Sequence, residues 1–255
     1  MEWIRKLGEH SLNGIEGLGR IWLLLWATLK WLVRRWPRRE VLIEQFYRIG
    51  NRSVPVVLTT GAFTGMVLAV QTYDQFKRLS VQTLVGAVVG LSMVKELGPV
   101  LTGVMLAGRV GASFTAEIGT MKVTEQIDAL RCLATDPVQY LILPRLIGCV
   151  VLAPLLTGMA DIIGMIGGYV IGVELFHIDQ FYYIEHTLRN VTGWDVASGL
   201  IKSAFFGLLI AIIPCYKGFT CSEGAEGVGK ATTEAVVITC IAILISDFFL
   251  TLLLG

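Results

Sequence analysis

The chain has 255 residues, of which 54% are hydrophobic and only 16% are charged, and its formal net charge is +1. A soluble domain carries about 25% charged residues, so this composition indicates an integral membrane protein. The near-neutral charge argues against a nucleic-acid partner, which would require a basic patch or stripe. The five cysteines and three histidines show no metal-binding spacing, so we expect no metal on this chain.

Residues 1–40 are predicted to form an amphipathic helix that lies on the membrane rather than crossing it. The run IWLLLWATL (21–29) is too short for a bilayer core of roughly 30 Å. Five of the six tryptophans, which favour the membrane interface, lie in this segment. Four arginines surround Pro37, which breaks the helix, and by the positive-inside rule they place this end in the cytoplasm. The apolar stripe recurs at helical spacing and consists of Ile15, Leu18, Trp22, Leu25, Leu29, Leu32 and Trp36.

The rest of the chain, 41–255, is predicted to be a single all-α transmembrane domain. Its apolar runs give five spans, at about 54–73, 81–116, 141–173, 197–217 and 231–254. Five spans put the charged segment after the second span and the connection before the last span in the cytoplasm, and the C-terminus outside. The second run is long enough to break at KELGP (95–99), and such a break would give six crossings instead.

The stretch GAEGVGKATT (224–233) differs by one residue from the phosphate-binding pattern GxxxxGK[ST], and ILISD (243–247) resembles a Walker B strand. Ala231 stands where a hydroxyl would hold Mg²⁺, and apolar spans flank the glycines where a P-loop needs a strand and a helix. We therefore expect no nucleotide on this chain. The glycines are interpreted as a flexible loop that leads into a helix.

Several glycine pairs at four-residue spacing predict close helix contacts in lipid or, alternatively, a surface that slides during transport. These pairs are Gly61 with Gly65, Gly86 with Gly90, Gly164 with Gly168, and Gly168 with Gly172.

Five ionisable residues fall within the predicted spans: Lys95, Glu96, Asp161, Lys202 and Asp247. Each would cost about 2.5 to 3.5 kcal/mol at a helix centre, so each should face protein or a wet cavity. One interpretation is internal pairing, for example of Glu96 with Lys202. The other is a polar cavity that meets a charged or zwitterionic head group. Asp247, near the chain end, is also compatible with the outer interface.

Residues 117–137 are predicted to form one amphipathic cytoplasmic helix. Asp136 and Pro137 end it and cap the next helix. Such a helix can dock into the groove of a soluble partner, or it can rest on the lipid head groups. Its apolar stripe is Val123, Ile127, Leu130 and Ala134, and the residues off the stripe are Thr124, Glu125, Asp128 and Arg131.

The block KELGPVLTGVMLAGRVGASFTAEIGTMKVTEQIDAL (95–130), followed by DP, IKS, GVGKATTEAVV and SDFFLT, resembles the MlaE/YrbE permease family. The resemblance runs from about Pro55 to the C-terminus. It implies a homodimeric permease of an ATP-binding cassette transporter that moves phospholipids between the inner membrane and the periplasm of diderm bacteria. The implied partners are a cytoplasmic ATPase that holds ATP and Mg²⁺, a periplasmic MCE-domain protein and, in many systems, a STAS-domain protein.

By position, the resemblance implies that Lys95, Glu96 and Lys202 line a lipid cavity. It implies that 117–134, with Thr124, Glu125, Asp128 and Arg131 off its apolar stripe, is the coupling helix that engages the ATPase. Relatives often carry Arg where this chain has Glu234, so a lipid-phosphate contact at this position is in question. Two other functions stay open: an ion-coupled secondary transporter that uses Glu96, Asp161 and Asp247, and a membrane scaffold without transport.

Overall fold

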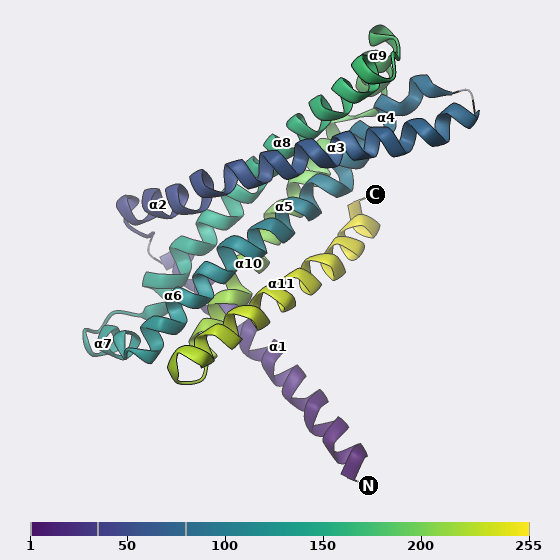
Figure 1. The fold of residues 1–255 in the computed structure, drawn as a ribbon. Helices are drawn as coiled ribbons and strands as arrows, with labels where there is room; N and C mark the ends of the chain where they lie inside the picture. The colour runs from purple at the N-terminus through teal and green to yellow at the C-terminus, as the bar shows by residue number, and fades with distance from the viewer. Residues whose placement is uncertain (1, 35, 80, 255) are drawn as a thin grey trace.

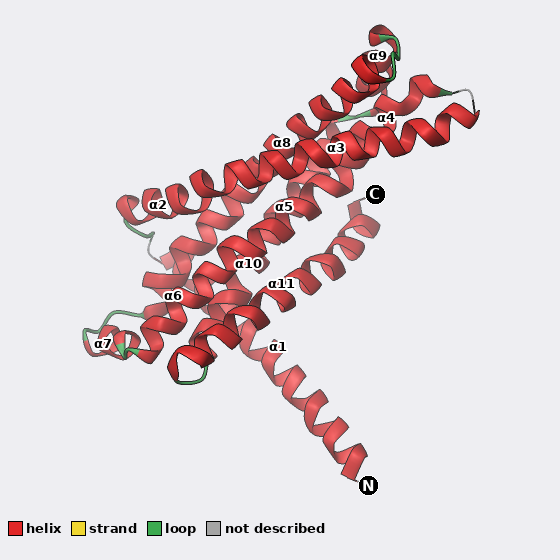
Figure 2. Ribbon diagram, viewed as in Figure 1, coloured by secondary structure: helices red, strands yellow, loops and turns green. Residues whose placement is uncertain are grey.

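The computed structural model of the chain describes residues 2–34, 36–79 and 81–254, and the regular structure in these ranges is helical throughout. The side chains of Ile15 and Leu18, two members of the predicted apolar stripe, lie outside the described part, as does Gly255. Figure 2 shows that the loops gather near the two ends of a bundle of long helices. The predicted all-α architecture is therefore confirmed for the residues described.

Five helical segments are long and apolar enough to cross a membrane: Arg39–Leu79, Gln82–Val123, Val138–Leu175, Gly193–Thr220 and Gly224–Leu254. They agree with the five predicted spans, and each extends beyond its apolar run. Their α-helical parts are α2 (Arg39–Phe46), α3 (Arg52–Leu79), α4 (Val85–Ser92), α5 (Gly98–Leu106), α6 (Ala112–Val123), α8 (Leu143–Tyr169), α10 (Gly193–Thr220) and α11 (Gly224–Leu254).

Short π-helical turns join the parts of the first two segments, and one of them, Met93–Leu97, lies at KELGP. A π-turn adds one residue to a helical turn without ending the helix. The segment Gln82–Val123 therefore stays one helical segment, so the described chain has five candidate spans rather than six.

Helix α1 (Glu2–Arg34) precedes the five segments and projects from the bundle in Figure 1. The helical structure is interrupted around Pro37 and resumes at Arg39, as predicted. Trp22 and Trp26 are both about two-thirds exposed. Farther along, Trp31 donates a hydrogen bond through Nε1 to Asp136 Oδ2 at 3.0 Å. This bond ties α1 to the start of the third span, whereas its placement on a membrane stays a prediction.

The segment 117–137 is not the single helix that was predicted. Helix α6 ends at Val123, Glu125 takes a left-handed backbone conformation with φ of 60°, and the short helix α7 covers Gln126–Cys132. The predicted apolar stripe required one straight helix. Because the chain turns at Glu125, α6 and α7 do not share an axis, and only Ile127 of the stripe is fully buried. The predicted cap at Asp136 is confirmed, because its Oδ1 accepts a hydrogen bond from the backbone N–H of Val138 at 2.8 Å.

The glycine-rich stretch 224–233 is also not a loop. Helix α11 begins at Gly224, which has φ of +85°, and the connection from α10 is only residues 221–223. Lys230 and Asp247 therefore lie on one helix, about 25 Å apart at 1.5 Å per residue, and do not share a phosphate cradle. A further helix that was not predicted, α9 (Gln180–Asn190), lies in the connection between the third and fourth spans.

The two ends of the bundle carry different elements. Figure 1 places α9, the end of α3 and the start of α4 at one end, and α7 with the connection from α10 to α11 at the other. This grouping is expected when each of the five segments crosses once, since alternate connections then share a side.

The predicted glycine contacts are confirmed where α3 crosses α8. A Cβ atom on Gly65 would overlap the carbonyl oxygen of Gly164, and one on Gly61 would lie 2.8 Å from the carbonyl oxygen of Ala160. Backbone therefore packs directly on backbone along this pair. The other pairs contact α9 in part: Gly86 and Gly172 both lie against the side chain of Tyr183.

Replacing Gly65 with Ala should destabilise the bundle by about 1 to 3 kcal/mol, because the added methyl group forces α3 away from α8. The matched control is Gly158→Ala on α8, where a Cβ meets nothing within 4 Å. Thermal unfolding of the two purified variants in the same detergent measures the difference. Equal melting temperatures would contradict the close crossing.

Candidate functional site

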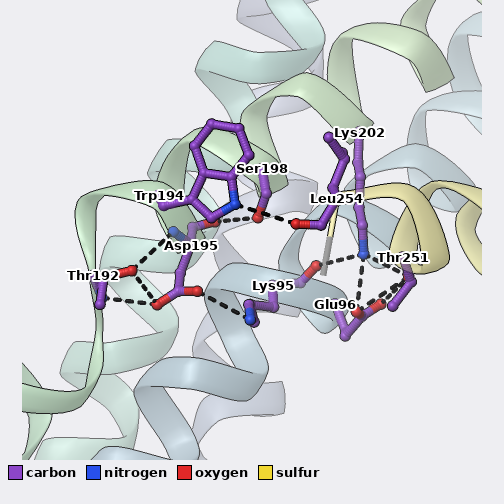
Figure 3. A network of polar contacts seen from close by, with 9 residues as sticks. All are labelled: Lys95, Glu96, Thr192, Trp194, Asp195, Ser198, Lys202, Thr251 and Leu254. Carbon is purple, nitrogen blue, oxygen red and sulfur yellow. Dashed lines mark hydrogen bonds and ion pairs between the residues drawn. The ribbon is translucent and has the colours of Figure 1, made fainter.

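A buried ammonium group joins three of the five helical segments near the α9 end. Lys202 on α10 is 2% exposed, and its Nζ donates to Glu96 Oε1 at 2.9 Å, to Thr251 Oγ1 at 2.8 Å and to the backbone oxygen of Lys95 at 3.0 Å. Figure 3 shows these bonds converging on the ammonium. Asp247 Oδ1 lies 3.4 Å from the same nitrogen. The predicted pairing of Glu96 with Lys202 is confirmed, and Asp247 belongs to this cluster.

A second ion pair lies beside the first. Lys95 Nζ is 3.0 Å from Asp195 Oδ1 at the start of α10. Asp195 Oδ2 also accepts hydrogen bonds from the backbone N–H and the hydroxyl of Thr192, which caps the helix. Asp195, in the first turn of α10, therefore both supports the helix cap and holds the Lys95 side chain (Figure 3).

The π-turn Met93–Leu97 brings the two ion pairs together. Lys95 and Glu96 are neighbours on it, and each reaches a different partner on α10. The turn fits closely between two helices, because a Cβ on Gly199 of α10 would overlap the carbonyl oxygen of Val94. π-turns inside long helices occur frequently at functional sites. We refer to Lys95, Glu96, Asp195, Lys202, Asp247 and Thr251 as the ionic cluster.

The ionic cluster is closed on one side and open on the other. The side chain of Lys202 is enclosed, whereas those of Glu96 and Lys95 are 39% and 35% exposed. These two side chains therefore reach the surface of the single chain, at a level where long apolar helices surround them. An exposed carboxylate beside an exposed ammonium can bind a zwitterionic or charged group through charge-assisted hydrogen bonds.

Asp161 is the one predicted site residue of the spans that the ionic cluster does not include. It lies on α8, is 6% exposed and contacts Gly98 on the far side of the π-turn. Glu234 on α11 pairs with Lys217 on α10 at 2.8 Å, so this carboxylate is already held by a cation of the same chain.

The four residues predicted to contact an ATPase lie at the opposite end of the bundle. Thr124, Glu125, Asp128 and Arg131 are all exposed, and Arg131 Nη1 bonds Asp128 Oδ1 at 3.0 Å. Ile127 is 4% exposed and anchors α7 in the core. The structure thus leaves these four side chains at the surface, while their coupling role stays a prediction.

A family model described as Permease MlaE matches residues 42–253, a range that contains nearly all of the five spans and α7. The chain belongs to the MlaE permease family. A probable ABC transporter permease protein of Rickettsia felis is 44% identical over 96% of this chain and 95% of its own length. A probable ABC transporter permease protein of Synechocystis is 46% identical over 85% of this chain and 82% of its own length.

A third relative is the intermembrane phospholipid transport system permease protein MlaE of Haemophilus influenzae. It is 34% identical over 98% of this chain and 97% of its own length. This MlaE-family chain is therefore a multi-pass membrane protein and a permease subunit of an ABC transporter.

Sequence reasoning missed two members of the ionic cluster in this MlaE-family permease. Asp195 follows Thr192 by three residues, which is the spacing of a capping box, so a signal for its local role was present. No pattern in the sequence links Thr251 to Glu96, because their helices meet only in the folded bundle. A further missed pair, Arg145 with Glu117 at 2.9 Å, joins α8 to α6.

Lys202→Met should lower the free energy of unfolding by about 3 to 5 kcal/mol, because it leaves two carboxylates facing each other without a cation. The control Lys217→Met removes the more exposed pair with Glu234 and should cost under about 1 kcal/mol. Adding Glu96→Gln and Asp247→Asn to Lys202→Met should recover part of the loss. Thermal unfolding in detergent checks all three, and a Lys202→Met protein as stable as wild type would contradict the role of the ammonium.

Proposed function

We propose that this chain is the membrane subunit of a transporter that moves phospholipids between the inner membrane and the periplasm or outer membrane, and so maintains outer-membrane lipid asymmetry. ATP is bound together with Mg²⁺ and is hydrolysed on a separate ATPase. Membership in the MlaE family and the name of the Haemophilus influenzae relative, an intermembrane phospholipid transport system permease, support this proposal. The chain lies in the inner membrane with its N-terminus in the cytoplasm, on the side of the arginines around Pro37.

The observation that carries the proposal is the open side of the ionic cluster. Glu96 and Lys95 are partly exposed among apolar helices, so their charges need water, a head group or a second chain beside them. A phospholipid head group carries a phosphate and commonly an amine, which match an ammonium and a carboxylate respectively. Its acyl chains are compatible with the apolar surface that surrounds the cluster.

A second copy of the chain would convert this open side into an enclosed cavity. Helix α11 carries Thr251 and Asp247 on its inner face, while few of its residues are buried in the single chain. Its outer face is apolar and is formed by Val237, Ile241, Leu244, Ile245, Phe248 and Leu252. We therefore propose a homodimer in which a lipid head group enters between the two ionic clusters.

The remaining proposed partners bind at the two ends of the bundle. The exposed charges of α7 fit an ATPase in the cytoplasm, with a STAS-domain protein as a further cytoplasmic partner. The end that carries α9 fits a periplasmic MCE-domain protein. A secondary transporter is less well supported, because Lys202 already pairs with Glu96 and Asp247.

Glu96→Ala should leave the complex assembled, since Lys202 keeps Thr251 and Asp247 as partners, but it should slow ATP-driven lipid transfer about tenfold by removing a charge-assisted bond. The measurement is transfer of labelled phospholipid by the purified complex in proteoliposomes. The control is Glu40→Ala at the start of α2, an exposed residue outside the cluster and outside both proposed docking ends. Normal transport by Glu96→Ala would remove Glu96 from the lipid site, and would favour a scaffold if ATP had no effect either.

Changing Glu125 and Asp128 together to Lys should reduce ATPase recovery with the tagged permease more than about tenfold, because reversed charges at an interface cost several kcal/mol. Glu185→Lys, at the opposite end, is the matched control. Co-purification from native membranes followed by mass spectrometry measures the ATPase and the bound lipid together. Unchanged recovery of the ATPase would exclude α7 as its binding site.

A further inference from the structure

Asp161 is a buried carboxyl group to which neither the ionic cluster nor the proposed lipid path assigns a role. It lies on α8 within a membrane-spanning segment and is 6% exposed. Its Oδ1 atom is buried and has no hydrogen-bond donor within reach among the described residues. A polar atom in this position costs free energy unless something satisfies it.

No cation in the described part of the structure pairs with Asp161. Helix α3 carries no charged residue between Arg52 and Asp74, and α4 and α5 carry none at all. The π-turn offers Lys95, which pairs with Asp195. Helix α10 offers Lys202, which pairs with Glu96 and Asp247, and Lys217, which pairs with Glu234. On α8 itself, Arg145 lies about 24 Å away along the helix and pairs with Glu117.

The surroundings of Gly98 show which group lies near the Asp161 carboxyl. A Cβ atom on Gly98 would overlap Asp161 Oδ1 and would lie 2.8 Å from the carbonyl oxygen of Met93. Asp161 Oδ1 and the Met93 carbonyl oxygen therefore both border the space where a side chain at position 98 would lie. An ionised carboxylate can only accept hydrogen bonds and would be repelled by the carbonyl, whereas a neutral acid has one O–H to donate.

We propose that Asp161 holds a proton within the membrane, and that this neutral acid donates a hydrogen bond to the Met93 carbonyl oxygen. The carbonyl already accepts from the backbone N–H of Gly98, and its second lone pair is available. The bond ties α8 to the first residue of the π-turn that carries Lys95 and Glu96. Asp161 is therefore a positioning residue, and its ligand is a proton.

Asparagine and leucine distinguish this role from simple packing. The amide of Asp161→Asn can still donate to Met93 but cannot titrate, while Asp161→Leu fills similar space and cannot donate. We expect Asp161→Asn to transfer lipid within about twofold of wild type and Asp161→Leu to be about five- to tenfold slower, the effect of one lost hydrogen bond near a buried carbonyl. Equal impairment of both variants would overturn the hydrogen-bond role.

The protonation state is measured without any transport assay. Infrared spectra of the purified permease, with its aspartate side chains ¹³C-labelled at the carboxyl carbon, should show an isotope-shifted band of a protonated acid. Asp161→Asn should remove that band, and the control Asp247→Asn, at an ion-paired carboxylate, should leave it in place.

The outcomes separate this proposal from the lipid-transport function. An acid band that depends on Asp161 supports the bound proton even if no lipid is moved. Absence of a protonated-aspartate band in the labelled wild-type protein overturns it, and this arm does not require Asp161→Asn to fold. A band that appears only after sodium and potassium are removed also overturns it, because a metal cation would then be the ligand.

Discussion

The ammonium group of Lys202 is enclosed by helices and shielded from water. The packing around it follows from the need to pair this buried charge. A lysine in this position is tolerated only when carboxylates and carbonyls replace its hydration shell. Glu96, Asp247, Thr251 and the Lys95 backbone oxygen supply those groups from the second and fifth spans. The cation therefore specifies how three spans meet, because a shift of any one would leave a charge unpaired.

Glycines allow the backbones to come close enough for these bonds. Gly199 admits the Val94 carbonyl, Gly98 admits the Asp161 carboxyl, and Gly65 admits the Gly164 carbonyl. Because these glycines have no Cβ atom, the π-turn can pack closely against α10 and α8, and α3 can pack closely against α8. Small residues and buried polar groups thus act together, as is common where lipid cannot drive helix association.

One continuous helical segment links the two ends of the permease. Gln82–Val123 carries Lys95 and Glu96 near the α9 end and reaches the turn before α7 at the other. Its far end is held by the pair of Glu117 with Arg145 and by the bond from Lys122 Nζ to the Cys221 carbonyl oxygen at 2.6 Å. A movement imposed at α7 would therefore act on the same segment that carries the ionic cluster.

The sequence by itself determined the membrane class and predicted the close glycine contacts, and it offered five spans and the pairing of Glu96 with Lys202 each as one of two alternatives. These follow from composition, apolar length and the cost of an unpaired charge in lipid, which do not depend on the fold. Only the tertiary structure decided that Thr251 and Asp195 complete the cluster, that Asp161 stays outside it, and that the chain reverses at Glu125 before α7. Those facts depend on which helix faces meet and on the single backbone angle at which the helix direction changes. The spacing of apolar residues along the sequence predicts neither.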